Sequence, residues 1–268
     1  MTAGASPAER ALSIPPVKHH MLRMFVNTDA VTTDWSIGRK VLSAFCETDE
    51  RLIPEYLYQW ETCIGEFETV EQCKDSWAWI AEVRANGSKH EFPLGLGWRR
   101  KKAVRYQAEI KHSGNNALGR WNGGDLSVYA APHKTVDWLP IFRRVCNALT
   151  PTFGLLHYFT PIEDTGRPGT AEGYFSGGII PSKGMPERIP NIGWATFFGG
   201  EFAKDVKAEQ IAEAGFAIEK VGDGYLARIT DNINDVADNY PHFSKRRVEL
   251  KKLFPDDFFL VKDEPISL

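Results

Sequence analysis

The sequence predicts an α+β fold, in which a mainly antiparallel sheet is partly covered by helices. Residues 103–111 alternate strictly between apolar and polar side chains, which is typical of an antiparallel strand with one face in water. Residues 216–220 and 225–230 are strand-like runs joined by a glycine-rich turn, as in a β-hairpin. Residues 138–149 carry a broad apolar stripe at helical spacing.

Composition excludes several functional classes. The chain has 268 residues, is 43% hydrophobic and has a net charge of −3. A protein that coats nucleic acid normally has a strong basic excess, so direct nucleic-acid binding is not expected. The basic run at 99–102, with Arg105, is interpreted as a solvated face. No stretch approaches the roughly 18 apolar residues that span a bilayer, and no membrane association is expected.

The cysteines and the N-terminus indicate a compartment. No two of the four cysteines have the spacing of a zinc or redox motif, and three lie on apolar helical stripes; they are Cys46, Cys63, Cys73 and Cys146. We interpret them as buried thiols of a reducing compartment. Residues 1–20 lack the apolar segment of a signal peptide. The protein is therefore expected to be cytoplasmic.

The N-terminal part begins with a lead-in and a strand. Residues 1–20, rich in Ala, Ser and Pro, are predicted to be loosely ordered. A first strand covers 21–27, and a helix begins at Asp34 with Thr33 as its cap. The aromatic run 53–60 favours a strand.

A capping box predicts the next helix. Thr69 and Gln72 stand at the spacing at which side chains cap the first turn. Apolar residues follow at helical intervals until Asn86 and Gly87 end the pattern; they are Val70, Cys73, Trp77 and Ile80. The prediction is a helix from Val70 to Asn86.

The middle of the chain supplies two more strands and a helix. After the alternating strand, the predicted elements are a strand at 125–131, a helix at 138–149 and a strand at 153–159. Thr135 or Asp137 caps the helix, and Pro140 falls in its first turn, where a missing N–H does little harm.

The segment 190–206 is the densest aromatic stretch. Its strand places Ile192, Trp194, Thr196 and Phe198 on one face and Gly193, Ala195 and Phe197 on the other, both buried. Gly199 and Gly200 then end the strand. A cluster of this kind is expected in the middle of a fold. Because it holds no nucleophile, base or metal ligand, we interpret it as architectural.

The remaining segments complete the organisation. A short helix at 207–214 ends at Gly215, and two helical pieces at 233–239 and 243–254 are divided by Pro241. The long polar passage 160–190 is interpreted as a recognition loop. Residues 21–268 form the folded part. Whether it is one domain or two subdomains, divided near 115–125 or 160–190, stays open.

The search for chemistry finds only weak candidates. Glu109 and Lys111 form an E-x-K pair that resembles half of a metal-dependent nuclease motif, but no Asp stands convincingly upstream to complete it. A solvent-facing row of charges explains the pair more simply. His133 and Asp137 can meet at a helix start, although capping explains Asp137 with fewer assumptions. His157 is interpreted as a core histidine. No triad, metal cluster or carboxylate pair can be assembled.

Tryptophans divide into core residues and candidates for an interface. Trp77, Trp138 and Trp194 fit the apolar stripes. Trp79 and Trp121 do not, and an exposed tryptophan is a common anchor at protein interfaces. A tryptophan folded back on its own domain is the alternative.

Three segments together resemble the immunity protein 52 family of bacterial polymorphic toxin systems. They are GWATFFGGEF at 193–202, WLPIFRRVCNALTPTFG at 138–154 and ITDNINDVADNYPHFSKRRVELKKLFP at 229–255, and the resemblance runs from about Met21 to the end. Members look like antidotes encoded beside toxins, often with a restriction-endonuclease-like domain, some delivered by type VI secretion. The resemblance implies a protein that binds and blocks one such toxin in interbacterial competition. It implies no catalytic residue, metal or cofactor.

The toxin-binding surface is not identified, nor is the oligomeric state. Nuclease clefts are usually electropositive, so acidic side chains are candidate contacts: Glu163, Asp164, Asp256 and Asp257. Each is equally explained as an ordinary solvated acid. Two alternatives stay open: an adaptor that loads a toxin for secretion, and a metal-dependent hydrolase with a dispersed site. The chain itself is expected not to be an enzyme.

Overall fold

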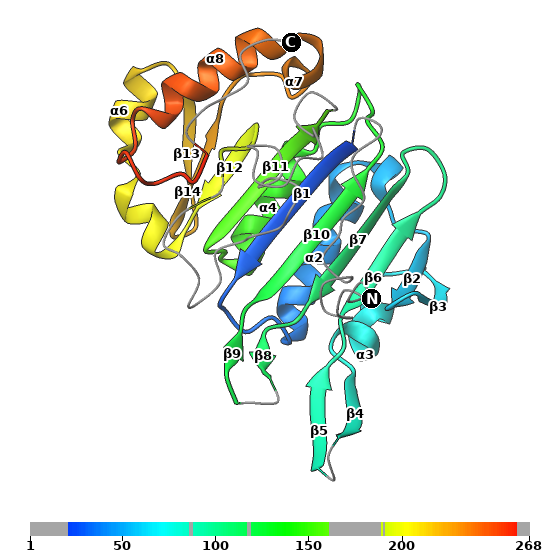
Figure 1. The fold of residues 1–268 in the computed structure, drawn as a ribbon. Coiled ribbons are helices and arrows are strands. Elements are labelled where there is room, and N and C mark those ends of the chain that lie inside the picture. The colour runs from blue at the N-terminus through cyan, green and yellow to red at the C-terminus, as the bar shows by residue number, and fades with distance from the viewer. Residues whose placement is uncertain (1–20, 86–87, 117–118, 161–188, 190, 262–268) are drawn as a thin grey trace, which may run out of the picture.

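A ten-stranded antiparallel sheet organises the protein. The computed structural model describes residues 21–85, 88–116, 119–160, 189 and 191–261 (Figure 1). In chain order the strands are β1 (Met21–Thr28), β2 (Tyr56–Gln59), β3 (Thr62–Glu66), β6 (Leu96–Arg100), β7 (Tyr106–Lys111), β10 (Gly124–Ala130), β11 (Phe153–Phe159), β12 (Ala195–Phe198), β13 (Ala217–Val221) and β14 (Gly224–Arg228). Their order across the sheet is β13-β14-β12-β11-β1-β10-β7-β6-β2-β3. The predicted α+β class is confirmed.

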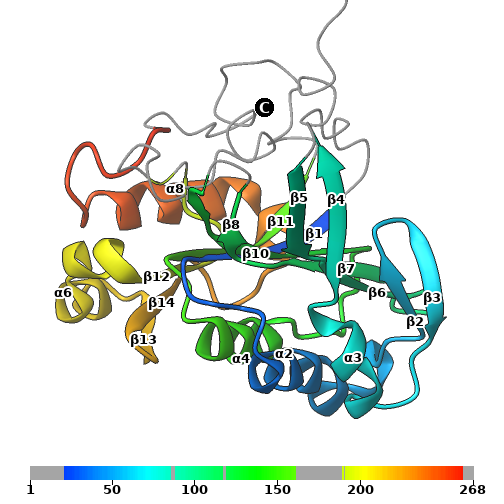
Figure 2. The same ribbon diagram turned by 90° about the horizontal axis from the view of Figure 1, so that it is seen from below.

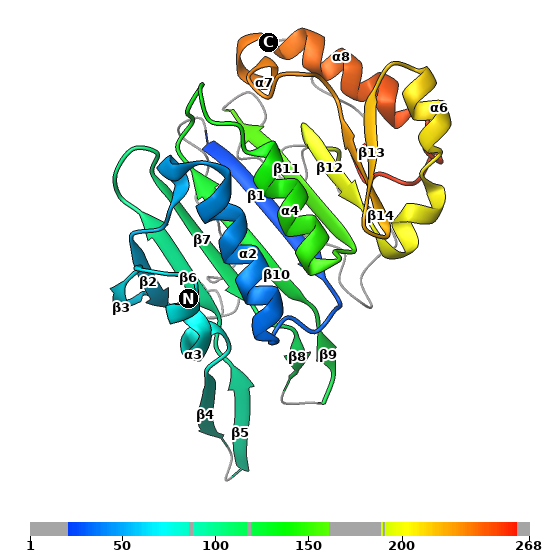
Figure 3. The ribbon, with the colours of Figure 1, turned by 180° about the vertical axis from the view of Figure 1, so that it is seen from behind.

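Helices α2 (Trp35–Thr48) and α4 (Leu139–Leu149) lie side by side on one face of the sheet (Figure 3). Phe45 of α2 packs with Trp98 and Tyr106, at ring-centroid distances of 5.3 and 5.6 Å. Because side chains alternate along a strand, the neighbours of Trp98 and Tyr106 point to the other face. Phe142 of α4 lies against Gly154 of β11 on the helix face.

The other face is covered at one end of the sheet by α8 (Tyr240–Lys251) (Figure 2). His157 of β11 faces this helix, and its ring lies 5.6 Å from that of Phe243. The short helices α6 (Ala208–Glu213) and α7 (Asp235–Asp238) lie at the same end (Figure 1). Beyond β10 no described helix covers this face, and the candidate functional site lies there (Figure 2).

The aromatic strand is buried in the core, as predicted, although it does not lie at the middle of the sheet. Residues 191–199 are buried as predicted, yet β12 is the third strand from one edge, and β1 is central. Phe198 packs against Phe254 and Phe258, with centroids 5.1 and 6.1 Å away. The density of aromatic residues therefore marks a strand that is covered on both faces rather than a central one.

The predicted helix from Val70 to Asn86 is wrong beyond Trp77. A 3₁₀ turn, η2 (Glu71–Cys73), and α3 (Lys74–Trp77) are followed by β4 (Ile80–Ala85), which pairs with β5 (Ser88–Pro93). The capping interaction is present, since the Gln72 amide N–H donates to Thr69 Oγ1 at 3.3 Å. The helix ends because the chain turns inward at Trp77, and the Ile80 side chain is exposed rather than on a buried stripe.

Side-chain contacts at the helix starts agree with the predictions at α4 and differ by one residue at α2. Asp34, not Thr33, caps α2 by accepting from the Ser36 amide at 2.7 Å. Of the two predicted residues at the start of α4, Asp137 accepts from the Leu139 amide at 2.9 Å. Pro241 lies in the first turn of α8, so the break between the last two helices falls at Asn239.

The four cysteines are free thiols, but they are not all buried as predicted, since one is exposed and one is half-buried. Cys63 is exposed because its strand, β3, forms the edge of the sheet. Cys73 and Cys146 are buried and Cys46 is half-buried. Burial raises the pKa of Cys46 to about 11 and that of Cys73 to about 12.

Within the described ranges, every helix is too short or too polar to serve as a bilayer span. The predicted recognition loop, at 160–190, and the lead-in at 1–20 lie almost wholly outside the described residues. Strands on both sides of 115–125 and of 160–190 belong to the same sheet.

Candidate functional site

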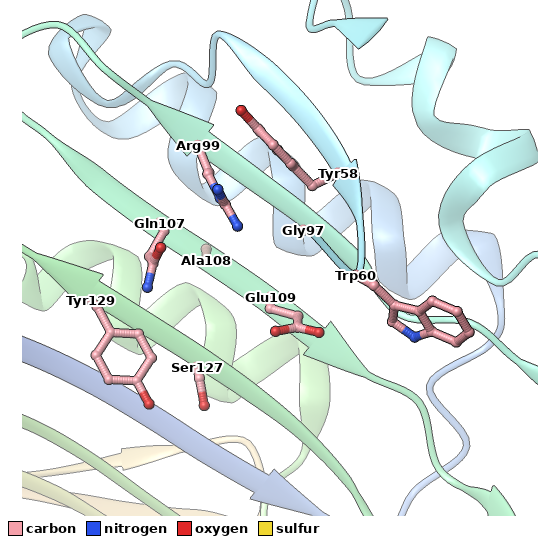
Figure 4. Close-up of a pocket in the computed structure, with 9 residues that line it drawn as sticks. All are labelled: Tyr58, Trp60, Gly97, Arg99, Gln107, Ala108, Glu109, Ser127 and Tyr129. Atoms are coloured by element: carbon pink, nitrogen blue, oxygen red, sulfur yellow. The ribbon is translucent and has the colours of Figure 1, made fainter. Parts of the chain in front are cut away.

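A polar hollow lies on the sheet face opposite α2 and α4, across β2, β6, β7 and β10 (Figure 4). Its volume is about 70 Å³, and its lining residues are Tyr58, Trp60, Gly97, Arg99, Gln107, Ala108, Glu109, Ser127 and Tyr129. The strand register brings these residues together, since Tyr58 is opposite Gly97, Gly97 opposite Glu109, and Glu109 opposite Ser127. We call it the sheet-face hollow.

Aromatic and cationic side chains form one wall of the sheet-face hollow. The Arg99 guanidinium carbon lies 4.0 Å from the centre of the Tyr58 ring, a cation–π contact. A Cβ at Gly97 would lie 3.4 Å from the Tyr58 Cβ, so the absence of a side chain at Gly97 leaves space for the hollow. Trp60, in the turn between β2 and β3, has a φ of 53° and is 66% exposed. It stands at the rim.

The hollow continues into a row of charged residues. On β7, Gln107, Glu109 and Lys111 are exposed and the intervening residues are buried, which confirms the predicted alternation. Asp125 of β10 stands directly opposite Lys111. Burial raises the pKa of Asp125, and the neighbouring Lys111 opposes that rise. The E-x-K pair thus has an acidic neighbour, which follows it in the chain instead of preceding it.

The described residues contain no group of three or more His, Cys, Asp or Glu side chains placed to hold a metal ion. Glu109 and Asp125 share a face of the sheet but do not stand opposite each other, because Glu109 is opposite Ser127 and Asp125 is opposite Lys111. A positively charged group can lie between the carboxylates of Glu109 and Asp125. Lys111, which stands opposite Asp125, already supplies one positive charge there.

The basic run 99–102 is held by the protein rather than being wholly solvated. Arg100 donates to the Ile53 carbonyl at 2.8 Å, and the Lys101 amide donates to Glu55 Oε2 at 2.8 Å. The Lys102 ammonium lies 3.0 Å from Glu55 Oε1. Glu55 therefore fixes the end of β6 and with it the position of Arg99.

Glu55 gives a pH-dependent contribution to stability. Burial alone would raise its pKa, but the hydrogen bonds from Lys101 and Lys102 and the Lys102 charge lower the pKa from 4.5 to about 2. The stabilisation is therefore complete above pH 4.5 and is lost as the pH falls towards 2. In urea unfolding, Glu55→Gln should be less stable than wild type at pH 7, and the difference should shrink between pH 4.5 and 3. A constant difference would contradict this role.

Other predicted candidates lie away from the sheet-face hollow. His157 is fully buried, and its Nδ1 accepts from the Trp194 amide at 3.0 Å, as expected for a core histidine. His133 contacts Thr135 at 3.2 Å while Asp137 caps α4, so these two do not form a site.

The residues predicted as candidate interface contacts differ in their exposure. Trp121 donates its indole N–H to the Asp29 carbonyl at 3.2 Å and is folded back, whereas Trp79 is 59% exposed. Asp256 and Asp257 are exposed near the C-terminal end of the described chain. Glu163 and Asp164 lie outside the described residues.

The sequence singled out Glu109 and the basic run that contains Arg99, but it did not indicate the other residues that line the hollow. Tyr58 and Trp60 fall in the run at 53–60, where the sequence predicts a strand but does not indicate which of its side chains share a face. Tyr129 and Ser127 fall in a predicted strand, where polar residues alternate with buried Leu126 and Val128. The signal was the alternation of both strands, and only the pairing through β6 brings the polar sides together.

The fold and the sheet-face hollow describe an α+β protein with one polar sheet face. No family model matches the chain. No curated protein is similar to it. Among solved structures, its fold is similar to that of a Pseudomonas aeruginosa T6SS protein, PA0821, with a TM-score of 0.52 and 15% sequence identity over 90% of this chain and 73% of that one. At this identity the likeness shows a common fold.

Proposed function

We propose that this chain is an immunity protein, which binds a cognate secreted toxin and neutralises it by stoichiometric inhibition. The observation that carries the proposal is the sheet-face hollow, where Arg99 and Trp60 present side-chain types that dominate protein–protein binding energy and the buried Tyr58 ring supports Arg99. The expected toxin is a nuclease with a restriction-endonuclease-like domain, as the family resemblance implies.

The size of the hollow favours a protein partner over a small substrate. Pockets for small molecules usually measure about 300–1,000 Å³. A hollow of about 70 Å³ suits one or two side chains inserted by a partner. Arg99 is stacked on Tyr58 and so is partly ordered before binding, which lowers the entropy lost when a partner docks.

Two comparisons support the setting. The fold is similar to that of a protein described as belonging to the T6SS. The sequence segments at 138–154, 193–202 and 229–255 resemble immunity protein 52, although no family model matches. Both are compatible with a toxin antidote and with a toxin adaptor.

The test is coexpression of the chain with the toxin encoded beside it, followed by DNA cleavage by the purified toxin with and without the chain. Rescue of growth and loss of cleavage at a 1:1 ratio are expected. Binding that leaves cleavage intact would favour the adaptor. Absence of binding would reject both.

Arg99→Ala should weaken toxin binding about tenfold or more, because it removes a cation of the hollow and frees Tyr58. The matched control is Lys40→Ala, which removes an exposed cation from α2 on the opposite face of the sheet. Isothermal titration with the purified toxin measures both. Equal affinity of the two variants would place the contact elsewhere.

A metal-dependent hydrolase is the second candidate, because Glu109, Lys111 and Asp125 share one face of the sheet. Purified chain would then cleave DNA in the presence of Mg²⁺ or Mn²⁺ and lose that activity in Glu109→Gln. We expect no cleavage with or without the substitution.

A further inference from the structure

We propose that the toxin docks on an acidic, apolar corner of the sheet, at β3 and the β4–β5 hairpin, and that its contacting surface is cationic. This proposal rests on the proposed function and names the surface through which it acts. We call the surface the edge surface and define it by its exposed apolar residues: Trp60, Ile64, Trp79, Ile80 and Val83.

Exposed apolar side chains are concentrated in this one segment. Six large hydrophobic residues are exposed in the described part of the chain, and five of them fall between residues 60 and 83. Trp60 and Trp79 are the most exposed, at 66% and 59%. A concentration of this kind on a folded chain marks a site of interaction.

The strand pairing brings the two halves of the edge surface to the same end of the sheet. Tyr58 of β2 is opposite Gly97 of β6, so the following turn, at Trp60, reaches the start of β6. Leu94, two residues before β6, donates its amide to the Trp79 carbonyl at 2.8 Å. The base of the hairpin and the β2–β3 turn therefore meet at one corner. Figure 2 shows the hairpin rising on the face that carries the sheet-face hollow.

The edge surface includes a strand whose outer side has no partner among the described residues. β3 is the last strand of the sheet and pairs only with β2. Four of its five residues are exposed. At the opposite edge, β13 is packed by α6, and Glu219 on it forms an ion pair of 2.8 Å with Arg143 of α4. One edge is covered and the other is available for an added strand or loop.

Charge selects the occupant of the edge surface. From Trp60 to Pro93, the end of the hairpin, the chain holds seven acidic and three basic side chains, a net charge of −4 in a chain whose total is −3. Glu61 and Glu66 are exposed at β3, and no ion pair reaches them among the described residues. Glu82 and Glu91 on the hairpin both pair with Lys89, at 2.6 and 2.8 Å. Glu71 and Asp75 belong to η2 and α3, which pack against α2, and Glu71 pairs with Arg39 of that helix at 2.7 Å.

Exposed apolar side chains next to the unpaired acids Glu61 and Glu66 fit a partner of opposite charge. The same acids repel a second copy of this chain, so edge-to-edge pairing between copies is disfavoured. A nuclease domain exposes a cationic surface where it holds nucleic acid. The edge surface can occupy that surface in place of the phosphates, and the nearby Arg99 and Tyr58 then lie within the same contact.

Cys63 supplies a probe that needs no substitution. It is an exposed thiol on β3, whereas the other three are buried or half-buried. A maleimide dye should therefore label Cys63 fastest, and excess toxin should slow that labelling at least tenfold. The control is a Lys40→Cys variant, whose added thiol on α2 should label at the same rate with and without toxin.

A second experiment uses two variants. One reverses two charges, with Glu61→Lys and Glu66→Lys together, and the other shortens a side chain, with Trp79→Ala. The charge variant should slow association about tenfold at low salt and remove most of its salt dependence. The truncation should raise the dissociation rate by tenfold or more. Thermal unfolding checks that each variant is folded, since all three residues are exposed.

The outcomes separate the two proposals. If wild-type chain does not bind the toxin, the proposed function and this inference both fail. If it neutralises the toxin while Cys63 stays fully reactive and the variants bind normally, only the edge surface is rejected. A toxin-free dimer that protects Cys63 in sedimentation and labelling would assign the surface to a second copy and overturn the proposal.

Discussion

Replacing Trp77 by Ala should lower the free energy of unfolding by about 3–5 kcal/mol. Trp77 is 1% exposed and lies between two rings, with centroids 6.2 Å from Trp35 and 5.2 Å from His112. Its indole N–H donates to the Thr32 carbonyl at 2.9 Å, which would lose its partner. A Cβ at Gly38 would lie only 2.5 Å from the indole, so the site is tightly packed. Urea unfolding measures the loss.

Two variants control this prediction. Trp77→Phe keeps most of the ring volume and removes the N–H, so its loss should be smaller, about 1–3 kcal/mol. Trp79→Ala, two residues away and 59% exposed, should change stability by less than about 0.5 kcal/mol. If both tryptophans cost the same, the inward turn of the chain at Trp77 would be contradicted.

Gly199→Ala should destabilise the protein by about 3 kcal/mol. A Cβ at Gly199 would lie 1.9 Å from the Pro151 carbonyl oxygen and 2.8 Å from the Phe197 ring. The backbone cannot easily retreat, because the Gly199 amide donates to the Thr152 carbonyl at 3.0 Å. The clash is with backbone, so side-chain adjustment does not relieve it. Thermal and urea unfolding report the effect.

The neighbouring glycine provides the comparison. Gly200 has a φ of 51°, and a Cβ there meets Thr152 at an ordinary 3.5 Å. Gly200→Ala should therefore cost only the strain of a left-handed conformation, about 1–2 kcal/mol. A larger loss of stability at Gly200 than at Gly199 would show that the turn conformation, rather than the close approach to Pro151, is the reason for glycine at these two positions.

Local periodicity was enough to predict much of the sheet. The strands at 103–111, 125–131 and 153–159 and the hairpin at 216–230 were predicted because each alternates or is uniformly apolar over its own length. The helix at 138–149 was predicted from its stripe. These patterns arise from burial on one or two faces, which the sequence records residue by residue.

Elements that depend on distant partners were not predicted. β4 falls within the predicted helix because Trp77 and Ile80 stand three residues apart, although one is buried and the other exposed. β6 is short and interrupted by glycine, and it is fixed by pairing with β2 and β7. The sheet-face hollow follows from that pairing, and the acidic neighbour of Lys111 follows from the pairing of β7 with β10, so no local pattern contains them.

The position of β1 has a consequence for how the chain folds during synthesis. Leu22 pairs with Ala130 on one side and with Tyr158 on the other, so its first partner is made 108 residues later and its second 136 residues later. At typical translation rates this interval is on the order of ten seconds. Before β10 is made, a largely apolar segment, MLRMFVNT, has no sheet partner. Nascent β1 is therefore expected to be a binding site for ribosome-associated chaperones, and polar substitution at Met24 should reduce such binding at the expense of the finished core.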